Sequence, residues 1–98
     1  MPTSRNAGLH SYLVETYWPG VTASRWKASA SRARLAAAAL RAQGSGIEIE
    51  TLLLISQDEV AFFLFNADSS DLVAEACRRA RVACDRILPV VRLDRVPR

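Results

Sequence analysis

Residues Val60 to Phe65 read Val-Ala-Phe-Phe-Leu-Phe, six apolar residues in succession. Successive side chains of a β-strand point to opposite faces, so a strand with this sequence presents apolar groups on both faces of its sheet. Such a strand has to be covered on both sides. This segment therefore excludes a sheet with one face fully open to water.

The rest of the chain supplies three more strand patterns but only two helical ones. The strands are expected at His10–Trp18, Ile47–Ser56, Glu59–Phe65 and Cys84–Leu93. One helix is expected from the N-cap Thr22 to about Gln43, and the other from the capping residues 66–70 to about Arg81. The order β-α-β-β-α-β is that of the ferredoxin-like split βαβ unit. Right-handed crossovers then predict an α+β sandwich, a four-stranded antiparallel sheet in the order 4-1-3-2 with both helices on one face.

The length of 98 residues fits a single domain, expected at 10–93 between a flexible N-terminal tail at 1–9 and a polar tail at 94–98. No apolar run exceeds six residues, which excludes a transmembrane helix of about 20. The first eight residues lack the apolar core of a signal peptide. We therefore expect a cytoplasmic protein that does not bind membranes.

Two helices cover only one face of the sheet, so the other face of the doubly apolar strand needs a different cover. For a chain this short the simplest cover is a second copy. We predict a homodimer packed through its sheet faces.

The net charge is +3, and twelve of the thirteen basic residues are arginine. A protein that follows phosphates usually clusters basic residues on one face. Here Arg78, Arg79 and Arg81 lie close in sequence to Asp71 and Glu75, which dilutes the charge. Nucleic acid is therefore not the expected partner.

The first helix carries basic residues and no acid: Arg25, Lys27, Arg32, Arg34 and Arg41. Lys27, Arg34 and Arg41 recur every seven residues and so line one side of the helix. This stripe is interpreted as the solvated face of an amphipathic helix, with an anionic partner as the alternative. The apolar stripe is expected at Trp26, Ala30, Ala33, Ala37 and Leu40.

Polar residues within the strands indicate which face each residue occupies. On the second strand, strict alternation puts Glu48 and Glu50 on the open face with Leu52 and Leu54, and leaves Ile47, Ile49, Leu53 and Ile55 for the helices. The same reasoning on the other strands gives a candidate ligand site among leucines, formed by Glu15, Tyr17, Glu50, Arg86 and Arg92. A carboxylate in such surroundings is either paired or has a raised pKa.

The open-face charges have two interpretations. They form a binding site for a small ligand, or they form structural ion pairs such as Glu15 with Arg86. A further hypothesis is proton transfer or cofactor-free oxygenation, with Glu15 as base and Tyr17 as proton donor. The sequence contains no recognisable catalytic set: no nucleophile-base-orienter trio and no Gly-rich phosphate loop.

Metal binding rests on few residues. Two cysteines are expected to remain thiols in a reducing cytosol. The side chains with suitable ligand chemistry are His10, Cys77, Cys84 and Asp85. Their spacing matches no recognised zinc pattern, and a free cysteine on an apolar helix face is usually a core residue.

Two segments, Tyr12–Thr22 (YLVETYWPGVT) and Arg78–Ile87 (RRARVACDRI), resemble a small family of uncharacterised bacterial ferredoxin-like proteins. The resemblance spans roughly residues 11–93. Some members of that family are called nickel-binding proteins, and the family is similar to dimeric α+β barrel proteins. The resemblance implies nickel held by histidines of the first strand and both helices. This chain has one histidine, His10, with Glu15 at the expected first-strand position and Cys77 near the second-helix position.

The sequence thus predicts a small homodimeric ferredoxin-like domain that binds a small ligand on or near its open sheet face. Two alternatives stay open: an α+β barrel type enzyme that uses Glu15 and Tyr17, and a protein that binds nickel or another transition metal.

Overall fold

Six regular elements and one 3-10 turn follow one another in the computed structural model, which describes residues 9–93. They are β1 (His10–Tyr17), α1 (Ala23–Ala42), β2 (Ile47–Ile55), the turn Ser56–Asp58, β3 (Val60–Ala67), α2 (Ser70–Ala80) and β4 (Arg86–Val90). The expected tails at 1–9 and 94–98 lie outside the described residues, apart from Leu9.

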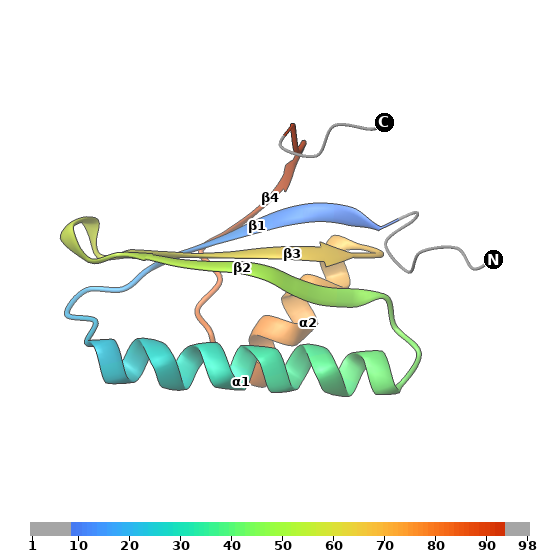
Figure 1. The fold of residues 1–98 in the computed structure, drawn as a ribbon, viewed down its shortest axis with the longest axis horizontal. Helices are drawn as coiled ribbons and strands as arrows, with labels where there is room; N and C mark the ends of the chain where they lie inside the picture. The colour runs from blue at the N-terminus through green and yellow to red at the C-terminus, as the bar shows by residue number, and fades with distance from the viewer. Residues whose placement is uncertain (1–8, 94–98) are drawn as a thin grey trace.

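The four strands form one antiparallel sheet in the order β2-β3-β1-β4. Both helices lie against the same face of this sheet, and in the described part of the chain no helix covers the other face (Figure 1). The predicted ferredoxin-like α+β fold and its strand order are confirmed. Pro89 lies in β4 at the edge of the sheet, where a residue without a backbone N–H is tolerated.

Helix α1 begins where the Thr22 hydroxyl accepts a hydrogen bond from the Arg25 amide at 3.2 Å. It ends before Gly44, whose φ of +94° suits glycine. The buried face of α1 consists of small residues and one leucine: Ser29, Ala33, Ala36, Ala37 and Leu40. Small side chains allow the helix axis to approach the sheet closely. The predicted apolar stripe is right at Ala33, Ala37 and Leu40, which are buried. Its other two members, Trp26 and Ala30, are only partly buried.

The core lies between the helices and the inner face of the sheet. Its largest fully buried side chains are Phe63, Phe65, Ile47, Val14 and Val73. Trp26 extends this core from α1, with its ring edge-on to that of Phe63 at a centroid distance of 5.4 Å. The two helices are joined by Arg32, whose Nε donates to the carbonyl of Ala80 at 2.8 Å.

The predicted facing of β2 is wrong beyond its midpoint. Ile49 pairs with Phe65, but the next pair along the ladder joins Thr51 to Leu64, so Glu50 is an extra residue in the strand. Such a bulge places two residues opposite one and reverses the alternation that follows. Leu52 and Leu54 therefore pack against the core, whereas Leu53 and Ile55 face outward and are 54% and 41% exposed.

Strand β3 runs further than predicted and β4 is shorter. Asn66 and Ala67 extend β3, because they pair with β1 on one side and β2 on the other. Before β4, the Asp85 carboxylate accepts a hydrogen bond from the Tyr17 amide at 2.7 Å and so holds a loop rather than a strand.

Glu75 on α2 lies between two guanidinium groups. It accepts hydrogen bonds from Arg78 at 3.1 Å and from Arg79 at 2.8 Å. These bonds lower the pKa of Glu75 from 4.5 to about 2. Because the folded-state pKa is depressed, the pair stabilises α2 above about pH 4.5, and this contribution is lost as the pH falls through about 2.

We expect a carbon-detected NMR titration of the Glu75 carboxyl to give a midpoint near 2 in the folded protein. Arg78→Gln should move that midpoint toward the ordinary value of glutamate. A midpoint near 4.5 in the unmodified protein would contradict the ion-paired geometry.

Candidate functional site

The face of the sheet opposite the helices is apolar along its middle. Leu13 on β1 lies beside Leu64 on β3 and Leu88 on β4, and Leu53 on β2 lies beside Phe62. We call this surface the open face. Most open-face side chains of its two central strands are half-buried, and no helix within residues 9–93 packs on them (Figure 1).

A cluster of hydrogen-bonded polar side chains lies at the end of the open face where β1 begins. Asn66 is at its centre and is 9% exposed. Its amide nitrogen donates to Glu50 at 2.6 Å and to Glu48 at 3.5 Å, and its amide oxygen accepts from the Ser11 hydroxyl at 2.9 Å. Glu50 is also ion-paired with Arg92. We call these five residues the polar cluster.

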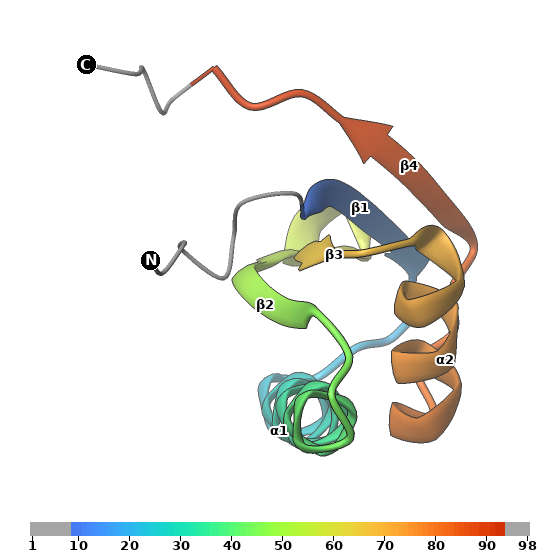
Figure 2. The ribbon, with the colours of Figure 1, turned by 90° about the vertical axis from the view of Figure 1, so that its right-hand side faces the viewer.

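Arg92 reaches the polar cluster from the opposite edge of the sheet. It follows β4, the edge strand beside β1, whereas Glu50 belongs to β2 at the other edge. The chain leaving β4 turns back over the open face, as Figure 2 shows. Because the side chains of Arg92 and Glu50 are only 19% and 16% exposed, their ion pair is shielded from water and holds this crossing segment in place.

Four of the five predicted ligand residues form two separate ion pairs. Glu50 and Arg92 belong to the polar cluster, while Glu15 pairs with Arg86 at 3.3 Å on the neighbouring strand. Tyr17 lies at the end of β1 and is 60% exposed. The ion pair suggested for Glu15 is thus present, and the structure does not bring all five residues into one pocket.

Glu15 and Tyr17 lie two residues apart on β1 and therefore point to the same face of the sheet. The Glu15 carboxylate accepts a hydrogen bond from Arg86 at 3.3 Å. Within residues 9–93, Glu15 and Tyr17 share no hydrogen bond.

The candidate metal ligands do not form one cluster, although Cys77 lies beside Cys84. His10 is exposed at the start of β1, Asp85 precedes β4 near the other end of β1, and Cys77 is buried in α2. No group of three His, Cys, Asp or Glu side chains in the described part of the chain is close enough to hold a metal ion.

The two cysteines differ in exposure. Cys77 is 2% exposed, and its burial beside Cys84 raises its pKa from 9.0 to about 12. Cys84 lies on the loop before β4 and is exposed. Cys77 therefore acts as a core residue, which is the alternative that the sequence offered.

We expect iodoacetamide at pH 8 to modify Cys84 on the order of 100-fold faster than Cys77, because thiolate character and access both favour Cys84. Peptide mass spectrometry after timed quenching measures both rates. In denaturant the two rates should become similar. Equal rates in the folded protein would contradict the burial of Cys77.

Sequence reasoning missed the centre of the polar cluster. Asn66, Glu48 and Ser11 were not among the predicted site residues. The available signal was Asn66 itself, the one polar residue between Val60 and Ala67. A polar side chain inside a doubly apolar strand needs hydrogen-bond partners, and these come from the neighbouring strands.

No helix within residues 9–93 combines the length and the apolar character needed to cross a membrane.

The fold is similar to that of a solved bacterial protein. The crystal structure of SCO4226 from Streptomyces coelicolor A3(2) matches with a TM-score of 0.63 and 17% sequence identity, over 82% of this chain and 94% of that chain. At this identity the likeness shows a shared fold and nothing about activity. No protein-family model and no curated protein sequence matches the chain.

Proposed function

We propose that this protein is a homodimer formed through the open faces of two sheets, and that it holds a small ligand on or near that face. The observation that carries the proposal is the distribution of exposed apolar side chains. Six large hydrophobic side chains are exposed among the described residues. Five of them lie on the open face or on the segment that crosses it: Tyr17, Leu53, Ile55, Val91 and Leu93.

The size of the open face suits a second copy. Four strands of about eight residues give a face of roughly 500 Å² in plan. Side-chain relief and the crossing segment add to this, so the accessible area approaches the ~800 Å² that each partner gives to a standard interface. Burying the leucines and phenylalanines of such a face is favourable at about 25 cal/mol per Å² of apolar surface.

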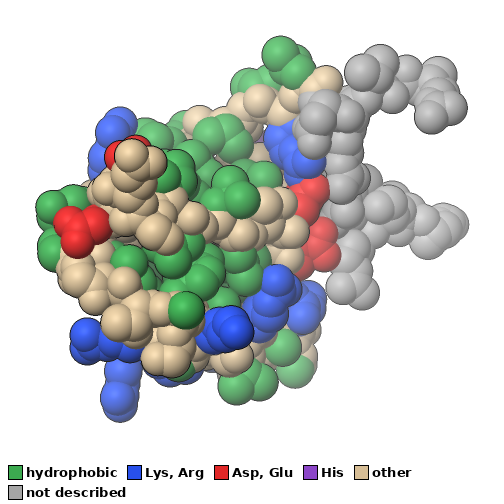
Figure 3. All heavy atoms as spheres, turned by 60° about the vertical axis from the view of Figure 1, so that its left-hand side comes forward, with side chains coloured by type: hydrophobic (Ala, Val, Ile, Leu, Met, Phe, Trp, Pro, Cys, Tyr) green, Lys and Arg blue, Asp and Glu red, His purple; other side chains and the backbone are tan. Residues whose placement is uncertain are grey.

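The charges of the open face also permit self-association. Three carboxylates, Glu15, Glu48 and Glu50, are nearly balanced by Arg86 and Arg92. Two such faces meet with little net repulsion. By contrast, basic side chains gather at the level of α1, below the hydrophobic atoms of the sheet (Figure 3).

The polar cluster supports the ligand-binding part of the proposal. Small-molecule sites combine an apolar lining with a few convergent polar groups. Here the hydrogen-bonding groups of Glu50, Asn66 and Arg92 converge beside the leucines of β1 and β3. A ligand with a polar head and an apolar body matches this arrangement.

Native mass spectrometry of the untagged protein as purified tests both parts. We expect a dimer, with extra mass where a ligand is retained. A clean dimer supports the interface alone, and a monomer at micromolar concentration would overturn the proposal. Neither the enzyme nor the metal alternative has a supporting observation within residues 9–93, because Glu15 is paired with Arg86 and the candidate metal ligands do not form one cluster.

A further inference from the structure

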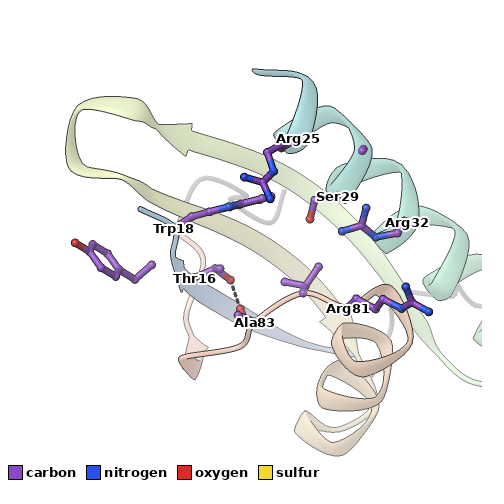
Figure 4. Close-up of a pocket in the computed structure, with 10 residues that line it drawn as sticks. Thr16, Trp18, Arg25, Ser29, Arg32, Arg81 and Ala83 are labelled. Carbon is purple, nitrogen blue, oxygen red and sulfur yellow. Dashed lines mark hydrogen bonds between the residues drawn. The ribbon is translucent and has the colours of Figure 1, made fainter. Parts of the chain in front are cut away.

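A cavity of about 400 Å³ lies mainly on the helix side of the sheet, and Tyr17 at the end of β1 is part of its lining. Its walls come from the end of β1, the first half of α1 and the loop between α2 and β4 (Figure 4). The lining residues that carry the argument are Thr16, Trp18, Arg25, Ser29, Arg32 and Arg81.

The cavity has three guanidinium groups and no carboxylate in its lining. Arg25 and Arg32 are seven residues apart on α1 and therefore share one side of the helix. Arg81 approaches from the loop on the other wall (Figure 4). Within residues 9–93, none of these three arginines forms an ion pair.

This concentration of positive charge is unfavourable without an anion. Like charges that face each other across a cavity repel, and the repulsion grows where the walls exclude water. The first turn of α1 adds to the field, since it contains Arg25 and no acidic residue to balance the positive end of the helix dipole. The Asp85 carboxylate accepts a hydrogen bond from the Tyr17 amide at 2.7 Å, and it forms no ion pair with the three arginines.

The cavity walls are held by bonds that leave groups for a ligand. The Nε of Arg32 donates to the Ala80 carbonyl at 2.8 Å, which fixes the side chain and leaves its terminal amino groups for an anion. The Thr16 hydroxyl donates to the Ala83 carbonyl at 2.5 Å and anchors the loop. Ser29, 2% exposed, adds a hydroxyl on the α1 wall.

We infer that this cavity binds the phosphoryl group of a small organic phosphate, with Arg25, Arg32 and Arg81 as its cationic ligands. A carboxylate is satisfied by one bidentate arginine, whereas a phosphoryl group carries up to two negative charges and three acceptor oxygens. Three guanidiniums that line one cavity match the charge and the acceptor oxygens of a phosphoryl group better than those of a carboxylate. The volume lies within the range of small-molecule sites and leaves space for an organic group beside Trp18.

Inorganic pyrophosphate is the probe, titrated at constant ionic strength and followed by calorimetry and tryptophan fluorescence. We expect saturable binding with a Kd near or below about 1 mM. Arg25→Gln and Arg81→Asn should each weaken it about tenfold, since each removes a charge-assisted contact. Asparagine is chosen at residue 81 because its φ of +58° is a left-handed conformation that asparagine tolerates.

Arg34→Gln is the matched control, because it removes the same charge from an exposed position of α1 that does not line the cavity. It should change the Kd less than about twofold. Thermal melting confirms that each variant is folded. Absence of saturable binding, or an equal loss in Arg34→Gln, would overturn the inference. Oligomeric state is measured separately from pyrophosphate binding, so failure of this inference and failure of the dimer proposal are distinguishable.

Discussion

Replacing Phe63 by alanine is expected to lower the free energy of unfolding by about 3–5 kcal/mol. Phe63 lies in β3, a central strand of the sheet, and is 0% exposed. Its ring packs edge-on against Trp26, so truncation removes the contact between α1 and the middle of the sheet. The buried walls cannot close fully around the space left behind, which adds a cavity cost to the lost burial.

Urea denaturation followed by circular dichroism measures this loss, with Phe62→Ala as the control. Phe62 is the adjacent residue of the same strand but points to the open face and is only partly buried. At submicromolar protein, where association contributes least, Phe62→Ala should cost clearly less than Phe63→Ala. Equal costs would contradict the assignment of the two faces of β3.

The strand order was predictable because it depends on local patterns and one chirality rule. Alternation, caps and turn residues identify six elements in the order β-α-β-β-α-β, and right-handed crossovers then leave one common arrangement. The doubly apolar β3 falls in the centre of the sheet for the same reason. Thr22 as the cap of α1 follows from its side-chain chemistry alone.

The facing of β2 was not predictable from alternation. A bulge at Glu50 reverses every later side chain, and its position depends on pairing with Leu64 and Phe65 of β3. The ion pair of Glu50 with Arg92 could not be predicted from local patterns either. The two residues lie on opposite edges of the sheet, and only the path of the chain after β4 brings them together.

The cavity lined by Arg25, Arg32 and Arg81 could not be predicted from the sequence either. In the sequence, Arg25 and Arg32 belong to a basic helix whose charged side is interpreted as solvated, and Arg81 belongs to a different segment, after the second helix. The fold places the end of α2 beside the first half of α1, and the Arg32 bond to Ala80 records that contact. A cluster drawn from two separate segments leaves no single spacing pattern in the sequence.

Replacing Leu53 by glutamate is expected to weaken dimerisation by more than about 100-fold. Leu53 is 54% exposed on the open face, beside Phe62 of β3. In a two-fold dimer each substitution occurs twice, so two unpaired carboxylates would be buried against apolar side chains. Because Leu53 contributes little to the core of the single chain, the variant should stay folded. Sedimentation velocity over a concentration series measures the change in association.

Leu35→Glu is the matched control, because Leu35 is also an exposed leucine, at 70%, but lies on α1 in the helix layer. It introduces the same charge and removes the same apolar group without touching the open face. It should therefore leave the dimer intact, while Leu53→Glu yields a folded monomer. If both variants dimerise as the unmodified protein does, the open face is not the interface. If both dissociate, the effect comes from net charge and not from contact between the sheets.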